Sequence, residues 1–185
     1  MWPMACLQWS NPESVAMKTE VSSTTPDWSR ERRAPGEWNP GKSLLKTIRD
    51  YQQHHSQPTL LSPFFRRWAV LRHHFWSAVS GADIPLNCQI GGGLLLPHPN
   101  GVVIHPAAVI GPNCLIFQQV TLGTRGGPDA PVLQGHVDVG AGAKLLGGIV
   151  VGEHAQIGAN AVVVNDVPPH AVAVGIPATV REVRR

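Results

Sequence analysis

The sequence predicts a mainly β protein: a parallel β-helix made of six-residue repeats, preceded by a small α-helical segment. An aliphatic residue recurs at intervals of six between residues 84 and 163, and a small or aliphatic residue mostly follows it four positions later. This period matches neither the turn of an α-helix nor the alternation of a simple strand, and it is typical of hexapeptide repeats. The repeating residues are Ile84, Ile90, Leu96, Ile104, Ile110, Ile116, Leu122, Leu133, Val139, Leu145, Val151, Ile157 and Val163.

Each repeat is expected to form one short strand and one turn, with the aliphatic side chain and its small partner pointing inward. If three strands close one coil, the repeats make about four coils, and stacking them buries a continuous core. The repeat is interrupted near residues 97–103 and 123–132, where loops are expected to leave the coil. Because aliphatic side chains fill the interior, the chemistry must lie on loops and outer faces.

The chain before the repeat divides into two parts. Residues 1–40 are polar and rich in Ser, Thr, Pro and Trp, which indicates a disordered extension. Residues 41–81 are expected to hold two helices, over 42–57 and 60–80. The apolar side of the second helix is expected to pack on the first coil or on a neighbouring subunit. Because this helix is basic, a membrane surface is the alternative. Residues 82–185 are expected to form the β-helix domain.

Composition narrows the possible functions. The net charge is +3, only 15% of residues are charged, and no run of Lys or Arg is interleaved with aromatics, so nucleic acid is not expected as a partner. Neither a secretory signal nor an apolar run of about 18 residues is present, so no transmembrane span is expected. Cys88 and Cys114 occupy small-residue positions of the repeat. With Cys6 they are interpreted as free thiols, which favours the cytoplasm.

Seven short motifs follow one another along the chain. They are Asp83-Ile84-Pro85, His98 with Asn100-Gly101-Val102-Val103-Ile104, Gln118-Gln119-Val120-Thr121-Leu122-Gly123, Gly140-Ala141-Gly142-Ala143-Lys144, Ile157-Gly158-Ala159, Val167-Pro168-Pro169 and Gly175-Ile176-Pro177-Ala178. In this order and spacing they resemble the hexapeptide-repeat acyltransferases, specifically the serine acetyltransferase branch, over about residues 42–180. The resemblance implies a left-handed β-helix, a homotrimer, and acetyl-CoA bound as co-substrate in grooves between prisms.

The resemblance also assigns roles to single residues. His98 matches the catalytic base of the family, and Asp83 matches the acidic residue that partners it. Ala141 and Ala159 match positions whose backbone atoms line the groove for the pantetheine arm of CoA.

Three positions depart from the family pattern. Pro97 stands where the family has Asp immediately before the catalytic His, and Ala130 stands where it has a His that helps to hold serine. His105-Pro106 replaces a Gly-Glu pair. Acetyl transfer is compatible with these changes, but serine as the acceptor does not follow, because residues that recognise it are altered.

Acetyl transfer from a thioester to a hydroxyl needs a base for the hydroxyl and a donor for the developing oxyanion. A neutral imidazole suits the first task near neutral pH, and a carboxylate on its other nitrogen would fix the tautomer, so His98 and Asp83 fit these roles. A backbone N–H near Gly123 or Thr124 is expected to stabilise the oxyanion, which places both residues on the acetyl-CoA side of the site.

Three further side chains are candidate contacts. Arg125 is a candidate for an acidic group on the acceptor or on CoA, Lys144 for the phosphates of CoA, and His105 for the acceptor. For each of them, a solvated surface side chain is the alternative interpretation.

The leading prediction is an acetyl-CoA-dependent O-acetyltransferase acting on L-serine, the reaction that serves cysteine biosynthesis. Two alternatives are acetylation of a hydroxyl on a sugar, a polysaccharide or another small metabolite, and a non-catalytic β-helix scaffold. Carbonic anhydrases of the γ type share this fold. Their paired ligand spacing is not shown by His98, His105, His136 and His154, so no metal is expected. The short helical segment favours a single trimer over a hexamer in which such helices join two trimers.

Overall fold

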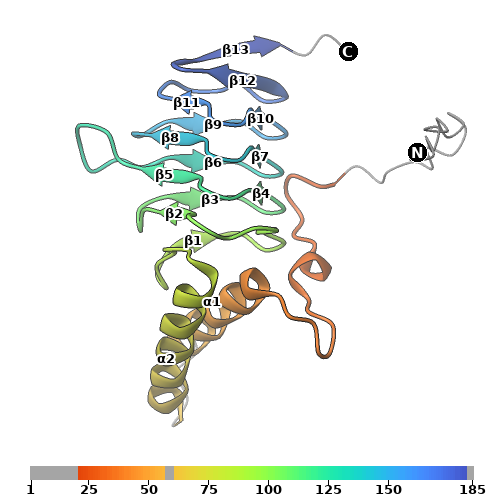
Figure 1. Ribbon diagram of the computed structural model, residues 1–185, viewed down its shortest axis with the longest axis vertical. Coiled ribbons are helices and arrows are strands. Elements are labelled where there is room, and N and C mark those ends of the chain that lie inside the picture. Colours follow the sequence, from red (N-terminus) through yellow and green to blue (C-terminus); the bar gives the residue numbers. More distant parts are fainter. Residues whose placement is uncertain (1–20, 57–60, 183–185) are drawn as a thin grey trace, which may run out of the picture.

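The computed structural model describes residues 21–56 and 61–182, and Cys6 therefore lies outside the described residues. It shows a stack of short strands above two α-helices (Figure 1). The strands are β1 (Gln89–Ile90), β2 (Val103–Ile104), β3 (Val109–Ile110), β4 (Leu115–Ile116), β5 (Thr121–Gly123), β6 (Val132–Leu133), β7 (Asp138–Val139), β8 (Lys144–Leu146), β9 (Val150–Val151), β10 (Gln156–Ile157), β11 (Val162–Val163), β12 (Ala171–Gly175) and β13 (Ala178–Glu182).

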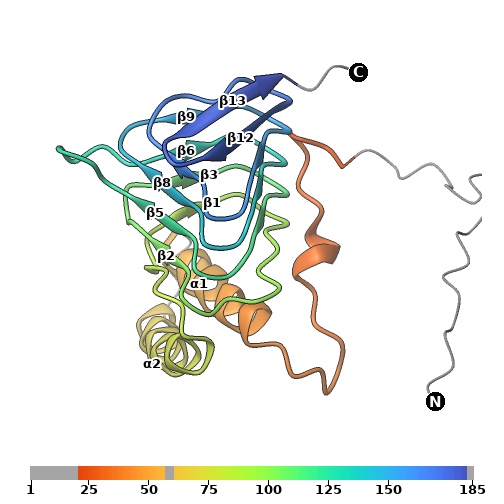
Figure 2. The ribbon, with the colours of Figure 1, turned by 45° about the horizontal axis from the view of Figure 1, so that its top comes forward.

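The strands form three sheets, which are the faces of a prism (Figure 2). We call β1-β3-β6-β9 sheet 1, β4-β7-β10-β12-β13 sheet 2, and β2-β5-β8-β11 sheet 3. The chain passes from sheet 1 to sheet 2 to sheet 3 in each coil, so its turns lie on a 1/2 edge, a 2/3 edge and a 3/1 edge. Among the described strands, only β13 runs antiparallel, and it pairs with β12 after the last coil. The predicted parallel β-helix is therefore confirmed.

The residues predicted to point inward form the core. All thirteen repeating aliphatic side chains are at most 8% exposed, and the small or aliphatic residues of the second register are buried as well. The register stacks like on like, with Ile110, Leu133 and Val151 at matching positions of successive sheet 1 strands. Adjacent coils approach closely at the edges, where a Cβ on Gly140 would lie 2.6 Å from the backbone nitrogen of Ala159. The interior is thus filled, and the edges and outer faces remain for chemistry.

Two helices close the base of the prism. The first, α1 (Pro40–Ser56), covers the first coil, and the second, α2 (Ser62–Ser80), packs on α1. The α1 side chains buried in the core are Leu44, Leu45 and Ile48. Gly81 ends α2 with a left-handed φ of 66°, and its N–H donates to the carbonyl of Ser77. This cap turns the chain into sheet 3, where Asp83 pairs with Val103.

The apolar side of α2 faces solvent. Trp68 is 52% exposed and Phe75 56%, whereas the buried residues of α2 include Ala69 and His73. Of the two predicted alternatives, packing of this side on the first coil is therefore not observed except for Trp76, and packing on a neighbouring subunit stays a prediction. Close packing on α1 selects the small residues of α2 for the inner face, and Trp76 is the α2 aromatic that packs against the core.

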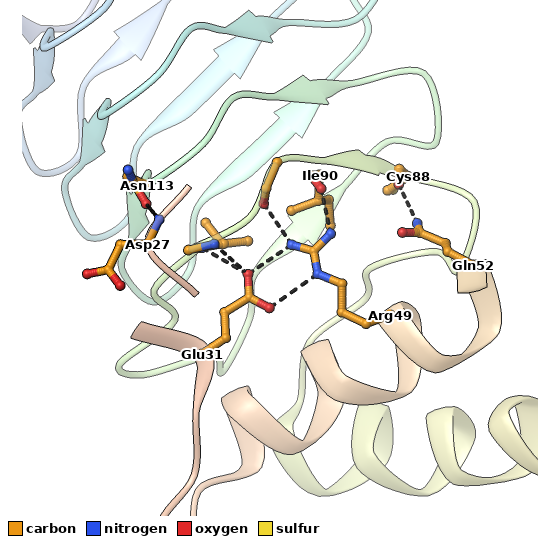
Figure 3. Close-up of polar contacts among 10 residues, drawn as sticks. Asp27, Glu31, Arg49, Gln52, Cys88, Ile90 and Asn113 are labelled. Carbon is orange, nitrogen blue, oxygen red and sulfur yellow. Dashed lines mark hydrogen bonds and ion pairs between the residues drawn. The ribbon is translucent and has the colours of Figure 1, made fainter. Parts of the chain in front are cut away.

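Residues 21–39 lie along the 1/2 edge as a strap that includes the single-turn helix η2 (Trp28–Glu31). Figure 3 shows the strap held by the carboxylate of Glu31. One oxygen of that carboxylate accepts from Arg49 at 2.9 Å and from the backbone N–H groups of Gly93 and Leu94 at 2.8 and 3.1 Å. The Glu31 side chain is only 10% exposed, so these bonds are largely shielded from water.

A second anchor of the strap lies one coil higher. The side-chain oxygen of Asn113 accepts from the backbone N–H of Asp27 at 2.8 Å (Figure 3). Its NH2 group donates to the carbonyls of Ser22 and Thr25. The expectation of disorder for this part of the N-terminal extension differs from the structure. Buried polar contacts order the strap, although its composition is that of a flexible segment.

Because the inward and outward positions of each strand differ so sharply, neighbouring substitutions should have different effects. Ile157 is 3% exposed, whereas the adjacent Gln156 points outward and is exposed. Ile157→Ala should lower the free energy of unfolding by about 2–5 kcal/mol, because it leaves a cavity in the core. Gln156→Ala should stay within about 0.5 kcal/mol. Unfolding by denaturant measures the free energy of unfolding of both variants. Equal decreases would contradict the inward orientation of Ile157 and the outward orientation of Gln156.

Glu31 should decide whether the strap stays docked. Glu31→Ala removes the acceptor of two backbone N–H groups and leaves Arg49 without its carboxylate, a loss of about 1.5–3 kcal/mol. Trypsin cleavage within residues 21–39 should therefore accelerate by about 10- to 100-fold. Thr24→Ala, at an exposed strap position, is the control and should cleave at the wild-type rate. An unchanged rate for the Glu31 variant would show that other contacts hold the strap.

Candidate functional site

His98 lies in a loop on the 2/3 edge of the first coil, and its side chain is exposed. The loop backbone is fixed from two sides. Below it, the N–H of Gly101 donates to the carbonyl of Gly81 at the end of α2, at 2.8 Å. Above it, the carbonyl of Asn100 accepts from the N–H of Gln119 at 2.9 Å. Pro97 and Pro99 restrict the backbone on both sides of His98. The imidazole is therefore carried on a rigid support and opens to solvent.

Asp83 opens sheet 3 directly below Val103, where the chain enters sheet 3 after the His98 loop. Its N–H donates to the carbonyl of Val102 at 2.8 Å, and its carbonyl accepts from Ile104 at 2.9 Å. The Asp83 side chain points outward and is exposed. Within the described part of the chain, the Asp83 and His98 side chains form no hydrogen bond with each other. The fold thus places Asp83 on the face that adjoins the edge of His98, without joining the two side chains.

The predicted groove residues continue upward from the His98 loop. The backbone N–H of Gly142 donates to the carbonyl of Gln118 at 2.9 Å. One coil higher, the backbone N–H of Asn160 donates to the carbonyl of Ala141 at 2.8 Å. Ala141 and Ala159 therefore occupy successive coils of the 2/3 edge above His98. A shallow hollow of about 290 Å³ lies beside this column on sheet 2, lined in part by Gly140 and Gly158. Small residues thus line the upper coils of this edge at Ala141, Gly142 and Ala159, where a long ligand would lie.

Gln118 is a site residue that sequence reasoning missed. Its side-chain oxygen is buried and has no hydrogen-bond partner among the described residues. Buried polar atoms are almost always paired, so an unpaired one on the edge above His98 marks a place for a donor from outside the chain. The only signal in the sequence was its position within a quoted motif, which gave no reason to single out its side chain.

The remaining predicted residues lie on sheet 3 or on the 3/1 edge. Lys144 lies on the outer face of sheet 3, where its ammonium donates to the Gln119 carbonyl at 2.6 Å and to the Thr121 hydroxyl at 3.1 Å. His105 lies on the 3/1 edge, and its Nδ1 accepts from the N–H of Ala107 at 3.2 Å. Sheet 3 therefore separates His105 from the column above His98.

A projecting loop on the 3/1 edge carries the predicted residues at the end of β5. The carbonyl of Gly123 accepts from the backbone N–H of Gly147 at 2.9 Å. Thr124 is half-buried, and Arg125 is exposed. Arg125 also lines an open hollow of about 570 Å³ with Asp166. In a single chain, sheet 3 lies between these residues and His98.

Ala130 ends the projecting loop and is buried. It is 7% exposed and belongs to the hydrophobic core. A side chain at this position therefore points away from any acceptor in solvent.

The thiols of Cys88 and Cys114 have no catalytic character. Burial raises the pKa of each to about 11, and for Cys88 the nearby charge of Asp83 adds to the effect. Both thiols are therefore protonated and unreactive at neutral pH. Within the described residues, no group of three or more His, Cys, Asp or Glu side chains is arranged to hold a metal ion.

Known proteins provide the family context for this geometry. No family model matches the chain. The serine acetyltransferase of Synechococcus elongatus is 44% identical over 113 residues, which cover 60% of this chain and 46% of that protein. Soybean serine acetyltransferase, solved as the apoenzyme and with serine, superposes with a TM-score of 0.66 and 37% identity, covering 77% of this chain and 57% of that one. By sequence and by fold, the chain is similar to serine acetyltransferases.

A serine acetyltransferase in complex with CoA gives the same result. Its TM-score is 0.66 at 33% identity, and the match covers 78% of this chain and 58% of the other. The similarity confirms the predicted resemblance and the left-handed form of the β-helix. The chain spans about half the length of the curated serine acetyltransferases it matches. In the described part of the chain, neither helix is long and apolar enough to cross a membrane.

Proposed function

We propose that this protein transfers the acetyl group of acetyl-CoA to a hydroxyl, with L-serine as the leading acceptor. The observation that carries the proposal is the column on the 2/3 edge, where His98 lies below Gln118, Ala141 and Ala159. Serine acetyltransferases are the proteins whose sequences and folds match this region, and solved examples hold serine or CoA.

His98 acts as the general base in this proposal. Its imidazole removes the proton of the acceptor hydroxyl as the oxygen attacks the thioester carbonyl. The tetrahedral intermediate then expels the CoA thiolate, which takes the proton back from the imidazolium. Asp83 orients the imidazole and stabilises its charged form, once side-chain movement or a bound acceptor brings the two groups together. The acetyl group passes directly to the acceptor, without an acyl-enzyme.

CoA lies along the small-residue column in this proposal. Ala141 and Ala159 leave room for the pantetheine arm, and the unpaired Gln118 oxygen accepts from one of its amide N–H groups. The N–H groups at Gly123 and Thr124 face the thioester oxygen, while Lys144 and Arg125 offer positive charge to phosphates or to the acceptor. His105 is a further contact for the acceptor.

Because Gly123, Thr124 and Arg125 lie across sheet 3 from the column in one chain, a second prism must bring a 3/1 edge beside a 2/3 edge. A homotrimer supplies that pairing three times. The outer face of sheet 3 supports such packing, since Val103 is 40% exposed there. Two buried free thiols fit a reducing compartment, which we propose is the cytoplasm.

The acceptor is the part of the proposal with a specific rival. Because Ala130 is buried and stands where the family has a His that helps to hold serine, the site lacks that contact. A sugar hydroxyl or another small-metabolite hydroxyl is the second candidate acceptor, with the same chemistry at His98.

Replacing the proposed base should abolish most turnover and leave CoA binding intact. His98→Ala should lower kcat by about 10²–10⁴-fold, because it removes the group that takes the hydroxyl proton. Asp83→Asn should lower kcat by a smaller factor. His55→Ala, an exposed histidine of α1, is the control. Release of free thiol from acetyl-CoA measures turnover, and calorimetry measures CoA binding. Near-normal turnover of the His98 variant would remove this residue from the mechanism.

The acceptor can be tested with the same assay. Acetyl-CoA is offered with L-serine in one series and with a panel of sugars in another, each with the His98→Ala protein as the blank. Turnover with serine above that blank is the expected result. Background turnover with serine beside rapid acetylation of a sugar would reverse the ranking of acceptors, whereas no turnover with either would contradict the proposed activity.

A further inference from the structure

The orientation of α2 is inverted relative to an ordinary amphipathic helix. Such a helix normally turns its apolar stripe toward the core. In α2 the buried residues are Ser62, Ala69, His73 and Ser80. Trp76 packs against the core, but most other large apolar side chains form an exposed stripe, of which Phe65 also stacks on His54 of α1. We call this outward stripe the aromatic face. It consists of Phe64, Phe65, Trp68, Leu71, Phe75 and Val79, which are 40–68% exposed.

Polar contacts on the inner side fix this orientation. The Nε2 of His73 lies 2.8 Å from the carbonyl oxygen of Ile84 in the first turn of the β-helix. The hydroxyl of Ser77 donates to the carbonyl of Ala82. Turning α2 over would break both contacts and would force bulky rings between α1 and α2. The exposure of the aromatic face is therefore specified by the fold.

The aromatic face is too large to be a random surface feature. Aromatic side chains present about 150–250 Å² each, so six large apolar residues at these exposures leave several hundred Å² uncovered. A contiguous apolar patch of this size on a folded protein marks an interaction surface. Figures 1 and 2 show α2 at the end of the molecule away from β13, with its outer side not covered by the strap or the β-helix.

The charges on α2 select the kind of partner. The helix contains three arginines and two histidines and has no acidic residue. Arg72 is paired with Asp50 at 3.0 Å and Arg66 lies over the ring of Tyr51, but Arg67 and His74 are exposed. A second copy of this face would bring like charges together. An apolar surface that carries negative charge satisfies both the rings and the arginine.

We propose that the aromatic face of α2 docks on an anionic phospholipid bilayer. The rings insert at the depth of the headgroups, and Arg67 meets the lipid phosphates. Aromatic residues beside basic ones are the composition of helices that lie in the membrane interface, and each basic residue near such a surface adds to the binding. Since α2 is not apolar enough to cross a bilayer, it lies on the surface. The end of α2 supports the His98 loop through Gly81, so docking would hold the 2/3 edge near the membrane.

The test is co-sedimentation of the full chain with vesicles of phosphatidylcholine, and with vesicles that also contain phosphatidylglycerol. Binding to the anionic vesicles and much weaker binding to neutral ones is expected. Arg67→Glu should weaken anionic binding by about tenfold or more, because it replaces an attraction by a repulsion. The double variant Trp68→Ser and Phe75→Ser should weaken it further. All three side chains in these comparisons are exposed, so thermal unfolding should not change.

The matched controls lie at the opposite end of the prism. Ile176→Ser removes an apolar residue that is 74% exposed, and Arg181→Glu reverses an exposed charge on β13. Both should bind like the wild type. The proposal would be overturned if the aromatic-face variants bound anionic vesicles as strongly as the wild type. It would also be overturned if the wild type failed to bind anionic vesicles. If, without vesicles, the wild type self-associates in analytical sedimentation and the double variant does not, a second copy of the chain covers the aromatic face. The membrane proposal is then wrong.

Discussion

The stacking of aliphatic side chains inside the prism is the interaction on which the rest of the structure depends. Every sixth residue points inward and lies over its counterpart in the next coil, as Ile110, Leu133 and Val151 do on sheet 1. This packing leaves no interior space for chemistry. Function must therefore lie on the three edges and faces, and each edge of this prism carries a different set of residues.

The edges have distinct roles. The 2/3 edge carries His98 and the small-residue column, and the 3/1 edge carries the projecting loop with Arg125. Neither edge alone encloses a ligand, which is the physical reason for proposing that neighbouring prisms complete the site. The 1/2 edge is occupied by the strap, where Glu31 and Asn113 bind backbone groups of the strap and of the turns. The strap therefore closes one edge to ligands and leaves the other two open.

The sequence was sufficient for the β-helix because the repeat is local and regular. The inward positions could be named one by one, and both interruptions coincide with loops in the structure. The strap could not be predicted, because its order depends on Glu31 meeting Arg49 and two backbone N–H groups that are distant in the sequence. The orientation of α2 was also missed. Hydrophobic periodicity shows that a helix has two faces, but contacts such as that of His73 with Ile84 decide which face turns inward.

The candidate site was predictable only in part for the same reason. His98 and Asp83 could be placed through motifs, whereas Gln118 became a candidate when its buried oxygen was seen to lack a partner. The most direct test of the account is a crystal structure of the protein with CoA and an acceptor bound. The account predicts CoA along the 2/3 edge beside Ala141 and Ala159, with a nitrogen of the His98 ring about 3 Å from the acceptor hydroxyl. CoA bound on another edge, or a His98 ring turned away from the acceptor, would contradict it.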